Sequence, residues 1–225
     1  MSFELTYAPK QLADIVISDS YVVSKLDAYI TQDTKRPLLL HGGYGVGKTS
    51  IANLLPDAIE GRPAVVNMIK ATDFKTAADV ASQFKANPFT GLPCFSINDG
   101  QKRQYLISNE LSITENAAKV LVDVLDDIQE HVQIIFTTNH LQTIYGALRS
   151  RCTILEIKPA LAMDWLVRAQ FIMKIEGLAM DDHLLLKIIE DQLKSEHDHR
   201  KLLQLLEQVV WQCRNGVMFQ SDKLS

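Results

Sequence analysis

The stretch Leu38-Leu39-Leu40-His41-Gly42-Gly43-Tyr44-Gly45-Val46-Gly47-Lys48-Thr49 decides the fold of this chain. Its apolar start ends in a glycine-rich turn, which is typical of a buried parallel strand that runs into a loop. Residues 42–49 match the pattern G-x-x-x-x-G-K-[ST] in full, and a helix is expected behind them, from about Thr49 to Ala58. Strand, loop and helix in this order form the context in which the pattern binds phosphate.

The glycine-rich turn predicts a nucleoside triphosphate site. Glycines let successive backbone N–H groups point inward at phosphate oxygens, and the following helix adds the positive end of its dipole. Lys48 is expected to bind the β- and γ-phosphates and the Thr49 hydroxyl to bind Mg²⁺, so the expected ligands are ATP and Mg²⁺. The residues assigned to this loop are Gly42, Gly43, Tyr44, Gly45, Val46, Gly47, Lys48, Thr49 and Ser50.

Strands and helices alternate behind the loop, which predicts an α/β fold with a parallel sheet flanked by helices, the P-loop NTPase class. The expected strands are 64–68, 105–108, 132–137 and 153–157. The expected helices are 74–85 and 115–130, with a loop at 87–93 and a short helix before the last strand.

The pattern changes after Pro159, where strand signals stop. Three helical patterns follow, at 161–175, 182–194 and 199–213. We therefore expect two domains, an α/β ATPase domain over 1–158 and a small three-helix lid over 159–225.

A phosphate-binding α/β protein of this kind needs a second strand that brings acidic groups beside the magnesium ion. The segment 120–123 ends in an acid, but its apolar residues share one helical face. A strand there would also leave fewer than the roughly dozen residues that a parallel crossover needs. The better candidate is 105–110, which places Glu110 at the carboxyl end of a strand, where it can orient the attacking water.

Asn109 then stands at the magnesium side of this strand. Its amide can accept a hydrogen bond from a magnesium-bound water but carries no charge. We therefore expect weaker Mg·ATP binding or slower turnover than an aspartate would give at this position.

Composition indicates an ordinary globular protein of 225 residues, with 47% hydrophobic and 22% charged residues. No apolar run approaches the roughly 20 residues of a membrane helix, and no secretory signal opens the chain. The net charge of −4 argues against a protein that wraps DNA alone, so nucleic acid is expected only at a local or shared patch. Cys94, Cys152 and Cys213 are expected as reduced, buried thiols of a cytoplasmic protein, in the host cytoplasm if the protein is viral.

Further segments resemble one family. Ser150-Arg151-Cys152 is similar to the S-R-C motif of sliding-clamp loader subunits, and 134–139 resembles the sensor 1 strand of the same proteins. Residues 7–16 resemble the box that packs on adenine, and Asp198-His199-Arg200 resembles the start of the sensor 2 helix. The chain thus looks like an AAA+ ATPase of the clamp-loader small-subunit type. The residues 99–102 resemble the corresponding segment of phage clamp loaders most.

The resemblance implies roles for several residues. Asn139 would polarise the attacking water, and Arg200 would touch the γ-phosphate from the lid. Arg151 would be an arginine finger that reaches the ATP of a neighbouring subunit, with Arg149 as a weaker candidate. The residues implied around the adenine are Tyr7, Pro9, Ile15 and Val16.

The implied function is an ATP-driven subunit that loads a ring-shaped partner, a sliding clamp or another replication protein, onto primer-template DNA. It would act in a homo- or hetero-oligomer built through its AAA+ domains, away from membranes. Two departures stand out. Asn109 replaces the family's usual aspartate, and we expect this chain to lack the helical collar domain that usually follows the lid in that family.

Two alternative functions stay open. One is a helicase loader or another DNA-remodelling AAA+ ATPase of a phage or mobile element. The other is a non-hydrolysing scaffold that binds ATP as a switch and lends Arg151 to a neighbour. Asn109 favours the scaffold, whereas Glu110 and Asn139 argue against it.

Other chemistry-bearing residues receive structural interpretations. The run His197-Asp198-His199 does not have the spacing of a metal site. Trp165 and Phe171 are expected in a helix core rather than as a base-stacking surface. Lys102 and Arg103 are expected in a solvated loop, with contact to DNA as the lesser alternative.

Overall fold

The computed structural model describes residues 2–70, 76–83, 101–127 and 132–215. The loop expected at 87–93 and Cys94 lie outside these ranges. Among the described helices, none combines the length and the apolar character needed to cross a membrane.

The chain forms two compact units. The sheet unit comprises Tyr21–Gly42 and Lys48–Ile157, and the helical unit comprises Met1–Ser20, Gly43–Gly47 and Lys158–Ser225. The first residues of the chain therefore belong with the helices at its other end, an association that the sequence did not indicate.

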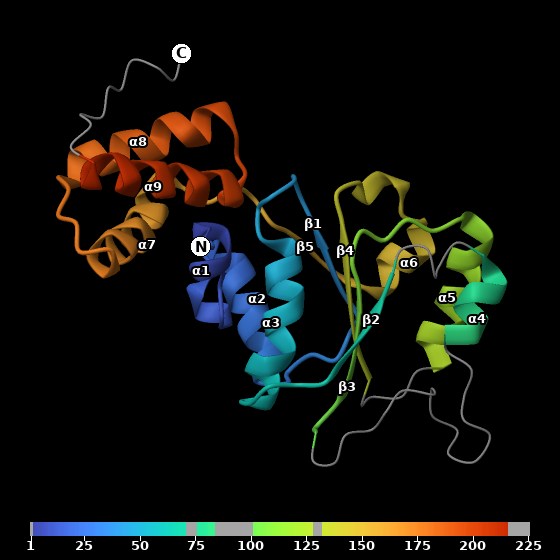
Figure 1. Ribbon diagram of the computed structural model, residues 1–225. Coiled ribbons are helices and arrows are strands. Elements are labelled where there is room, and N and C mark those ends of the chain that lie inside the picture. Colours follow the sequence, from blue (N-terminus) through green and yellow to red (C-terminus); the bar gives the residue numbers. More distant parts are fainter. Residues whose placement is uncertain (1, 71–75, 84–100, 128–131, 216–225) are drawn as a thin grey trace. The chain divides into compact units, whose positions relative to one another are not determined.

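The sheet unit is built on five parallel strands in the order β2-β3-β4-β1-β5 (Figure 1). The strands are β1 Leu38–His41, β2 Val66–Ile69, β3 Gln104–Ser108, β4 Val132–Thr138 and β5 Thr153–Glu156. Every residue of β3 and β4 is buried, as expected for central strands that are covered on both faces. The parallel α/β sheet predicted from the sequence is confirmed.

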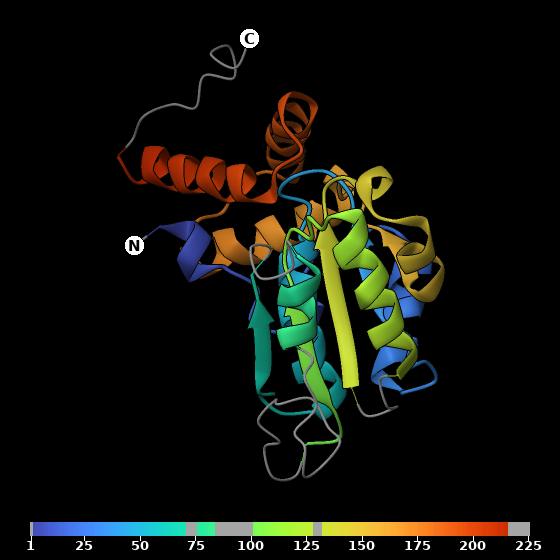
Figure 2. The ribbon, with the colours of Figure 1, turned by 90° about the vertical axis from the view of Figure 1, so that its right-hand side faces the viewer.

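Helices cover both faces of this sheet. In Figures 1 and 2, α2 Ser20–Ile30 and α3 Lys48–Glu60 lie on one face. The opposite face carries α4 Ala77–Gln83, α5 Glu115–Asp127 and α6 Gly146–Arg151, and the short η3 Leu141–Thr143 precedes α6. The segment 120–123 lies within α5, which confirms that it is not the acidic strand.

The apolar residues of the sheet alternate between the two faces. Leu39, Leu106 and Phe136 pack in one cluster with Leu121 of α5 and Leu148 of α6. The α3 face instead receives fully buried side chains of that helix, Ile51 and Leu55 among them. Helix α3 also contains Pro56, inside an otherwise regular helix.

A buried polar network fixes the end of α3 to the start of β3. The Glu60 carboxylate accepts hydrogen bonds from the backbone N–H groups of Lys102 and Arg103 and from the Tyr105 hydroxyl, the last at 2.6 Å. Burial works to raise the pKa of Glu60, but these donors outweigh it and leave the pKa below its usual value.

Arg103 therefore contradicts the expectation of a solvated loop. Its side chain is only 4% exposed, and its guanidinium donates to the Gln133 side chain of β4 at 2.8 Å. Lys102 remains exposed, although its ammonium group donates to the Ile59 carbonyl.

The helical unit packs three long helices against the start of the chain. These are α7 Ala162–Ile175, α8 Asp182–Ser195 and α9 His199–Arg214, with α1 Phe3–Thr6 and the short η1 Leu12–Asp14 from the N-terminus. Phe3 and Tyr7 join the apolar core formed by the three helices.

Two expectations for this unit's residues need correction. Trp165 is buried as expected, but Phe171 is 52% exposed, because it lies on the solvent face of α7. Cys152 in the sheet unit is buried, whereas Cys213 near the end of α9 is exposed. Burial raises the pKa of the Cys152 thiol to about 12.

His199 makes the stability of the protein sensitive to mild acid. Its ring contacts Trp165 edge-on, with ring centroids 5.0 Å apart, and burial lowers its pKa from 6.5 to about 4, against the opposing effect of Asp198. The folded protein keeps this imidazole neutral, so the unfolded state binds one more proton between these two values.

We expect the unfolding free energy to fall by about 3 kcal/mol through this group as the pH drops from 7 to 4. Urea titrations of the native protein and of His199→Phe at several pH values measure this effect. The variant should lose part of the slope over that interval. Equal slopes in the two proteins would contradict the assignment.

Candidate nucleotide site

The predicted site residues of the sheet unit leave the sheet at one edge. Strand β4 lies between β1 and β3, and all three are parallel, with His41 level with Thr138 and Ser108 level with Phe136. The glycine loop follows β1, Asn139 follows β4, and residues 109–110 follow β3. Since neighbouring strands lie about 5 Å apart, the three segments begin within roughly 10 Å of one another.

This edge coincides with a reversal in the winding of the sheet. The chain leaves β1 through α3 on one face and leaves β4 through α6 on the other (Figure 1). In open parallel sheets, ligands bind beyond the carboxyl ends of the strands at such a reversal. The strand order therefore predicts a ligand site at the end of β1, where the sequence pattern also predicts one.

The backbone of the glycine loop adopts conformations that suit glycine. Gly42, Gly45 and Gly47 have φ angles of +144°, +69° and +97°. A Cβ on Gly42 would come within 2.2 Å of the Ile157 carbonyl oxygen. The Val46 side chain is buried, and Tyr44 is 66% exposed. The loop has the geometry that a phosphate cradle requires.

Lys48 opens α3, and its side chain turns back along the loop. The ammonium group is buried and donates a hydrogen bond to the Gly42 carbonyl at 3.0 Å. Thr49 and Ser50 occupy the first turn of the same helix, with Thr49 exposed. Burial lowers the pKa of His41, with Glu156 acting in the opposite direction and Lys48 adding to the decrease. A lysine, a hydroxyl and a glycine-rich loop are the groups that bind ATP and Mg²⁺ in sites of this pattern.

Thr137 of β4 holds the turn that carries Asn109 and Glu110. Its hydroxyl accepts from the Glu110 N–H at 3.1 Å and donates to the Asn109 side-chain oxygen at 3.4 Å. Its carbonyl accepts from the Leu111 N–H at 2.7 Å. Glu110 is exposed and has a φ of +56°, which is uncommon for a residue with a side chain. Strain of this kind is concentrated at functional sites.

Arg151 is bound within its own chain at the end of α6. Its Nε and Nη2 donate to the two carboxylate oxygens of Asp126 at 2.7 and 2.6 Å, and its Nη1 donates to the Ala147 carbonyl. The preceding residue is fixed by Arg36, which donates to the Ser150 carbonyl at 2.7 Å. The hydrogen bond from Arg151 holds the pKa of Asp126 below its usual value.

Arg200 lies in the helical unit beside the glycine loop. Asp198 caps α9 by accepting from the Arg200 N–H and also pairs with the Arg200 guanidinium, Nη2 to Oδ2, at 2.9 Å. The His199 N–H donates to the Gly45 carbonyl at 3.1 Å, so the start of α9 contacts the loop directly.

The residues expected around adenine are divided between two environments. Ile15 lies beside the loop, with its Cγ2 3.5 Å from the position that a Cβ on Gly47 would take. Val16 packs against the helical core, and Pro9 is half-buried. Tyr7 is buried and bound to the Glu176 carboxylate, and burial together with that hydrogen bond raises its pKa to about 12.

The structure thus gathers Lys48, Thr49, Asn109, Glu110 and Asn139 at one sheet edge, and Ile15 and Arg200 beside Gly43–Gly47 in the helical unit. Sequence reasoning assigned no role to Thr137, Asp126 or Asp198. A threonine two residues before Asn139 and an acid at the cap of α9 are visible in the sequence. No local pattern singles out Asp126.

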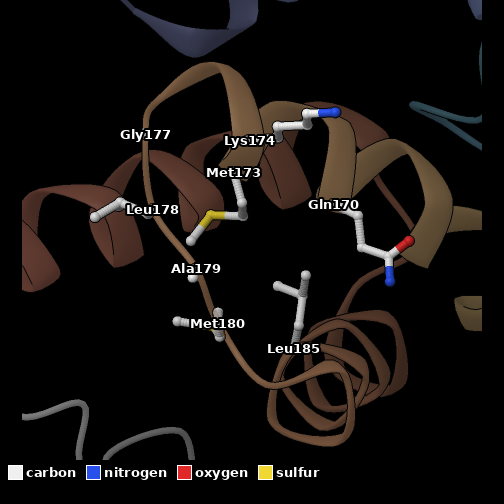
Figure 3. Close-up of a pocket in the computed structure, with 8 residues that line it drawn as sticks. All are labelled: Gln170, Met173, Lys174, Gly177, Leu178, Ala179, Met180 and Leu185. Carbon is white, nitrogen blue, oxygen red and sulfur yellow. The ribbon is translucent and has the colours of Figure 1, made fainter.

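A separate surface cavity lies at the turn between α7 and α8 (Figure 3). It has a volume of about 460 Å³ and is lined mostly by apolar side chains, among them Met173, Met180 and Leu185. Gln170 and Lys174 are its polar side chains. Such a lining offers no phosphate cradle. Within the described ranges, no group of three or more His, Cys, Asp and Glu residues could hold a metal ion.

Comparison with known proteins identifies a family and distant relatives of this chain. The family model described as "ATPase family associated with various cellular activities (AAA)" matches residues 38–159. Replication factor C subunit 5 of Arabidopsis thaliana is 27% identical over 205 residues, which cover 89% of this chain and 53% of that protein. The replication factor C small subunit of Thermofilum pendens is 26% identical over 89% of this chain and 60% of its own length.

The chain therefore spans a little over half the length of these curated relatives. Among solved structures, the RuvB Holliday junction branch migration motor of Thermotoga maritima aligns with a TM-score of 0.64 at 18% identity. That alignment covers 93% of this chain and 65% of the motor. This likeness shows the fold.

The close approach of Gly42 to Ile157 yields a stability prediction. We expect Gly42→Ala to lower the unfolding free energy by about 3 kcal/mol, because strain at positive φ and a backbone clash add together. Gly61→Ala is the matched control, since Gly61 has a φ of +67° and no atom within 4 Å of the added methyl group. It should lose only about 1 kcal/mol. Chemical denaturation measures both, and equal losses would refute the clash.

Proposed function

We propose, from the premise that this chain belongs to the AAA family of ATPases, that it hydrolyses ATP as one subunit of a sliding-clamp loader. The chain is distantly related to replication factor C small subunits over 89% of its length. The observation that carries the proposal is the meeting of the glycine loop, Glu110 and Asn139 at neighbouring strand ends. The partners would be a ring-shaped clamp and primer-template DNA.

The residues at the sheet edge divide the work of hydrolysis. Lys48 and the loop N–H groups would bind the phosphates, and Thr49, with Asn109 through a water molecule, would hold the Mg²⁺ that neutralises phosphate charge. Glu110 and Asn139 orient the attacking water. Thr137 accepts hydrogen bonds from the Glu110 and Leu111 N–H groups, and these bonds fix the backbone from which the Glu110 side chain extends.

Arg151 would complete the site of a neighbouring subunit. An arginine finger raises the rate by 10³–10⁵, which corresponds to roughly 4–7 kcal/mol of barrier. The Arg151–Asp126 pair is largely exposed, and ion pairs of this kind contribute little free energy. The barrier lowering that an arginine finger gives therefore far exceeds the free energy lost when Arg151 leaves Asp126. A free protomer, which receives no finger from a neighbour, should be almost inactive.

The net charge of the chain favours a DNA site formed by several subunits over one formed by a single subunit. With a net charge of −4, one subunit has no excess of positive charge to bind phosphate groups along a duplex. Several subunits that surround the DNA could each contribute a local basic patch. ATP hydrolysis that responds to primed DNA would then be a property of the assembly.

Substitution of Arg151 tests the proposal. In the assembled enzyme, Arg151→Ala should reduce ATP turnover by about 10³-fold or more, because the transition-state charge loses its neutralising partner. ATP binding should remain within a few-fold of the native value. Arg149→Ala, on the same helix, is the matched control and should retain turnover. Unimpaired hydrolysis by assembled Arg151→Ala would sink the finger assignment.

Substitution of Asn109 tests the magnesium side of the site. Asn109→Asp should tighten Mg·ATP binding or raise turnover, since a carboxylate adds a negative charge beside the metal. Steady-state kinetics over a range of Mg²⁺ concentrations measures both. If neither changes, the assignment of β3 as the acidic strand is wrong.

The stimulating partner separates this function from the two alternatives. ATP turnover is measured alone, with primed DNA, and with primed DNA and a clamp, and the proposal expects the last to be fastest. Stimulation by single-stranded DNA or a helicase alone would indicate a helicase loader. Tight ATP binding without turnover under any condition would indicate a scaffold, the alternative that Asn109 favours.

A further inference from the structure

Asp198 lies directly against the middle of the glycine loop. A Cβ built on Gly45 would come within 2.1 Å of the Asp198 carboxyl carbon and within 2.5 Å of both its oxygens. The next residue, His199, donates its N–H to the Gly45 carbonyl at 3.1 Å. All of these residues belong to the helical unit, so the contact lies within one compact body.

The same carboxylate holds the guanidinium of Arg200. Oδ1 accepts from the Arg200 N–H at 2.8 Å and from its Nε at 3.2 Å, and Oδ2 accepts from Nη2 at 2.9 Å. The two side chains differ in exposure, with Asp198 only 13% exposed and Arg200 65% exposed. Asp198 is thus largely covered by its surroundings, while most of the Arg200 side chain faces solvent.

The carboxylate is ionised at neutral pH. Burial works to raise its pKa, but the side-chain and backbone hydrogen bonds from Arg200 outweigh this effect and lower it. A fixed negative charge therefore stands next to a loop whose ligand is itself a polyanion. A phosphate bound at this loop and the Asp198 carboxylate would compete for the same Arg200 cation.

We propose that Asp198 is a positioning residue that holds Arg200 until the γ-phosphate of ATP takes the guanidinium away. The proposal rests on the proposed function, in which the glycine loop binds ATP. ADP has no γ-phosphate, so the Arg200–Asp198 pair stays closed when ADP is bound. Loss of the γ-phosphate returns Arg200 to Asp198, which makes the pair a sensor of the state of the nucleotide.

The competition predicts an unequal effect of Asp198 on the two nucleotides. In Asp198→Asn, ATP gains Arg200 without first breaking an ion pair, so its Kd should fall about fivefold, as expected for a partly exposed pair. The Kd of ADP should change less than twofold. Asparagine is as good a helix cap as aspartate, so α9 keeps its start. Titration with fluorescent ATP and ADP analogues in Mg²⁺ measures both constants.

Two further variants isolate the ion pair. Asp181 caps α8 in the same unit through the N–H groups of His183 and Leu184, so Asp181→Asn is a matched cap control that should leave both Kd values unchanged. Arg200→Ala should weaken ATP binding. Adding Asp198→Asn to Arg200→Ala should then produce no further tightening of ATP, because the cation for which the two anions compete is gone.

The outcomes that overturn the proposal are distinct from those that overturn the function. Equal tightening of ATP and ADP in Asp198→Asn would show general repulsion instead of exchange. Tightening that persists in the Arg200→Ala background would have the same meaning, and an unchanged ATP affinity would also reject the exchange. If the native protein binds neither nucleotide, the proposed function fails as well, whereas any of the earlier results leaves it standing. Thermal melts confirm that each variant is folded.

Discussion

The pairing of β1 with β4 is the constraint on which the rest of the molecule depends. Leu38, Leu39 and Leu40 are fully buried between two neighbouring strands, so the end of β1 is fixed in all directions. The glycine loop can take unfavourable φ angles because the strand before it and the helix after it are both anchored. Parallel pairing then brings the carboxyl ends of β3 and β4 to the same edge of the sheet as that of β1, whatever the conformation of the loops that follow them.

Two ion pairs on the surface of the protein fix the positions of arginine side chains and contribute little to stability. Arg151 and Arg200 each form a two-point pair with an acid of their own chain, at Asp126 and Asp198. Partly exposed pairs of this kind contribute little free energy. They nevertheless define where each guanidinium rests before a phosphate is present. Both arginines would thus change partners during the same reaction cycle.

The sequence predicted those parts of the fold that local patterns specify. Apolar runs located the strands, and the glycine pattern located the loop, because both depend on neighbours in the chain. Arg103 was misjudged because its partner Gln133 and the nearby Glu60 come from distant elements. Phe171 was misjudged because helical periodicity alone does not say which face of α7 is covered. Resemblance predicted roles for Glu110 and Asn139, and the strand order brings the ends of β3 and β4, which these residues follow, to the same edge of the sheet as the end of β1.

The path of the chain between its two units has a consequence for cooperativity. The backbone crosses from one unit to the other four times, at residues 20–21, 42–43, 47–48 and 157–158. A cut at residue 158 would therefore separate the three long helices from Phe3 and Tyr7, which complete their core. The fragment after residue 158 would therefore lack part of its apolar core. Because Gly43–Gly47 belongs to the helical unit and is joined at both ends to the chain of the sheet unit, unfolding of one unit releases a covalent restraint on the other.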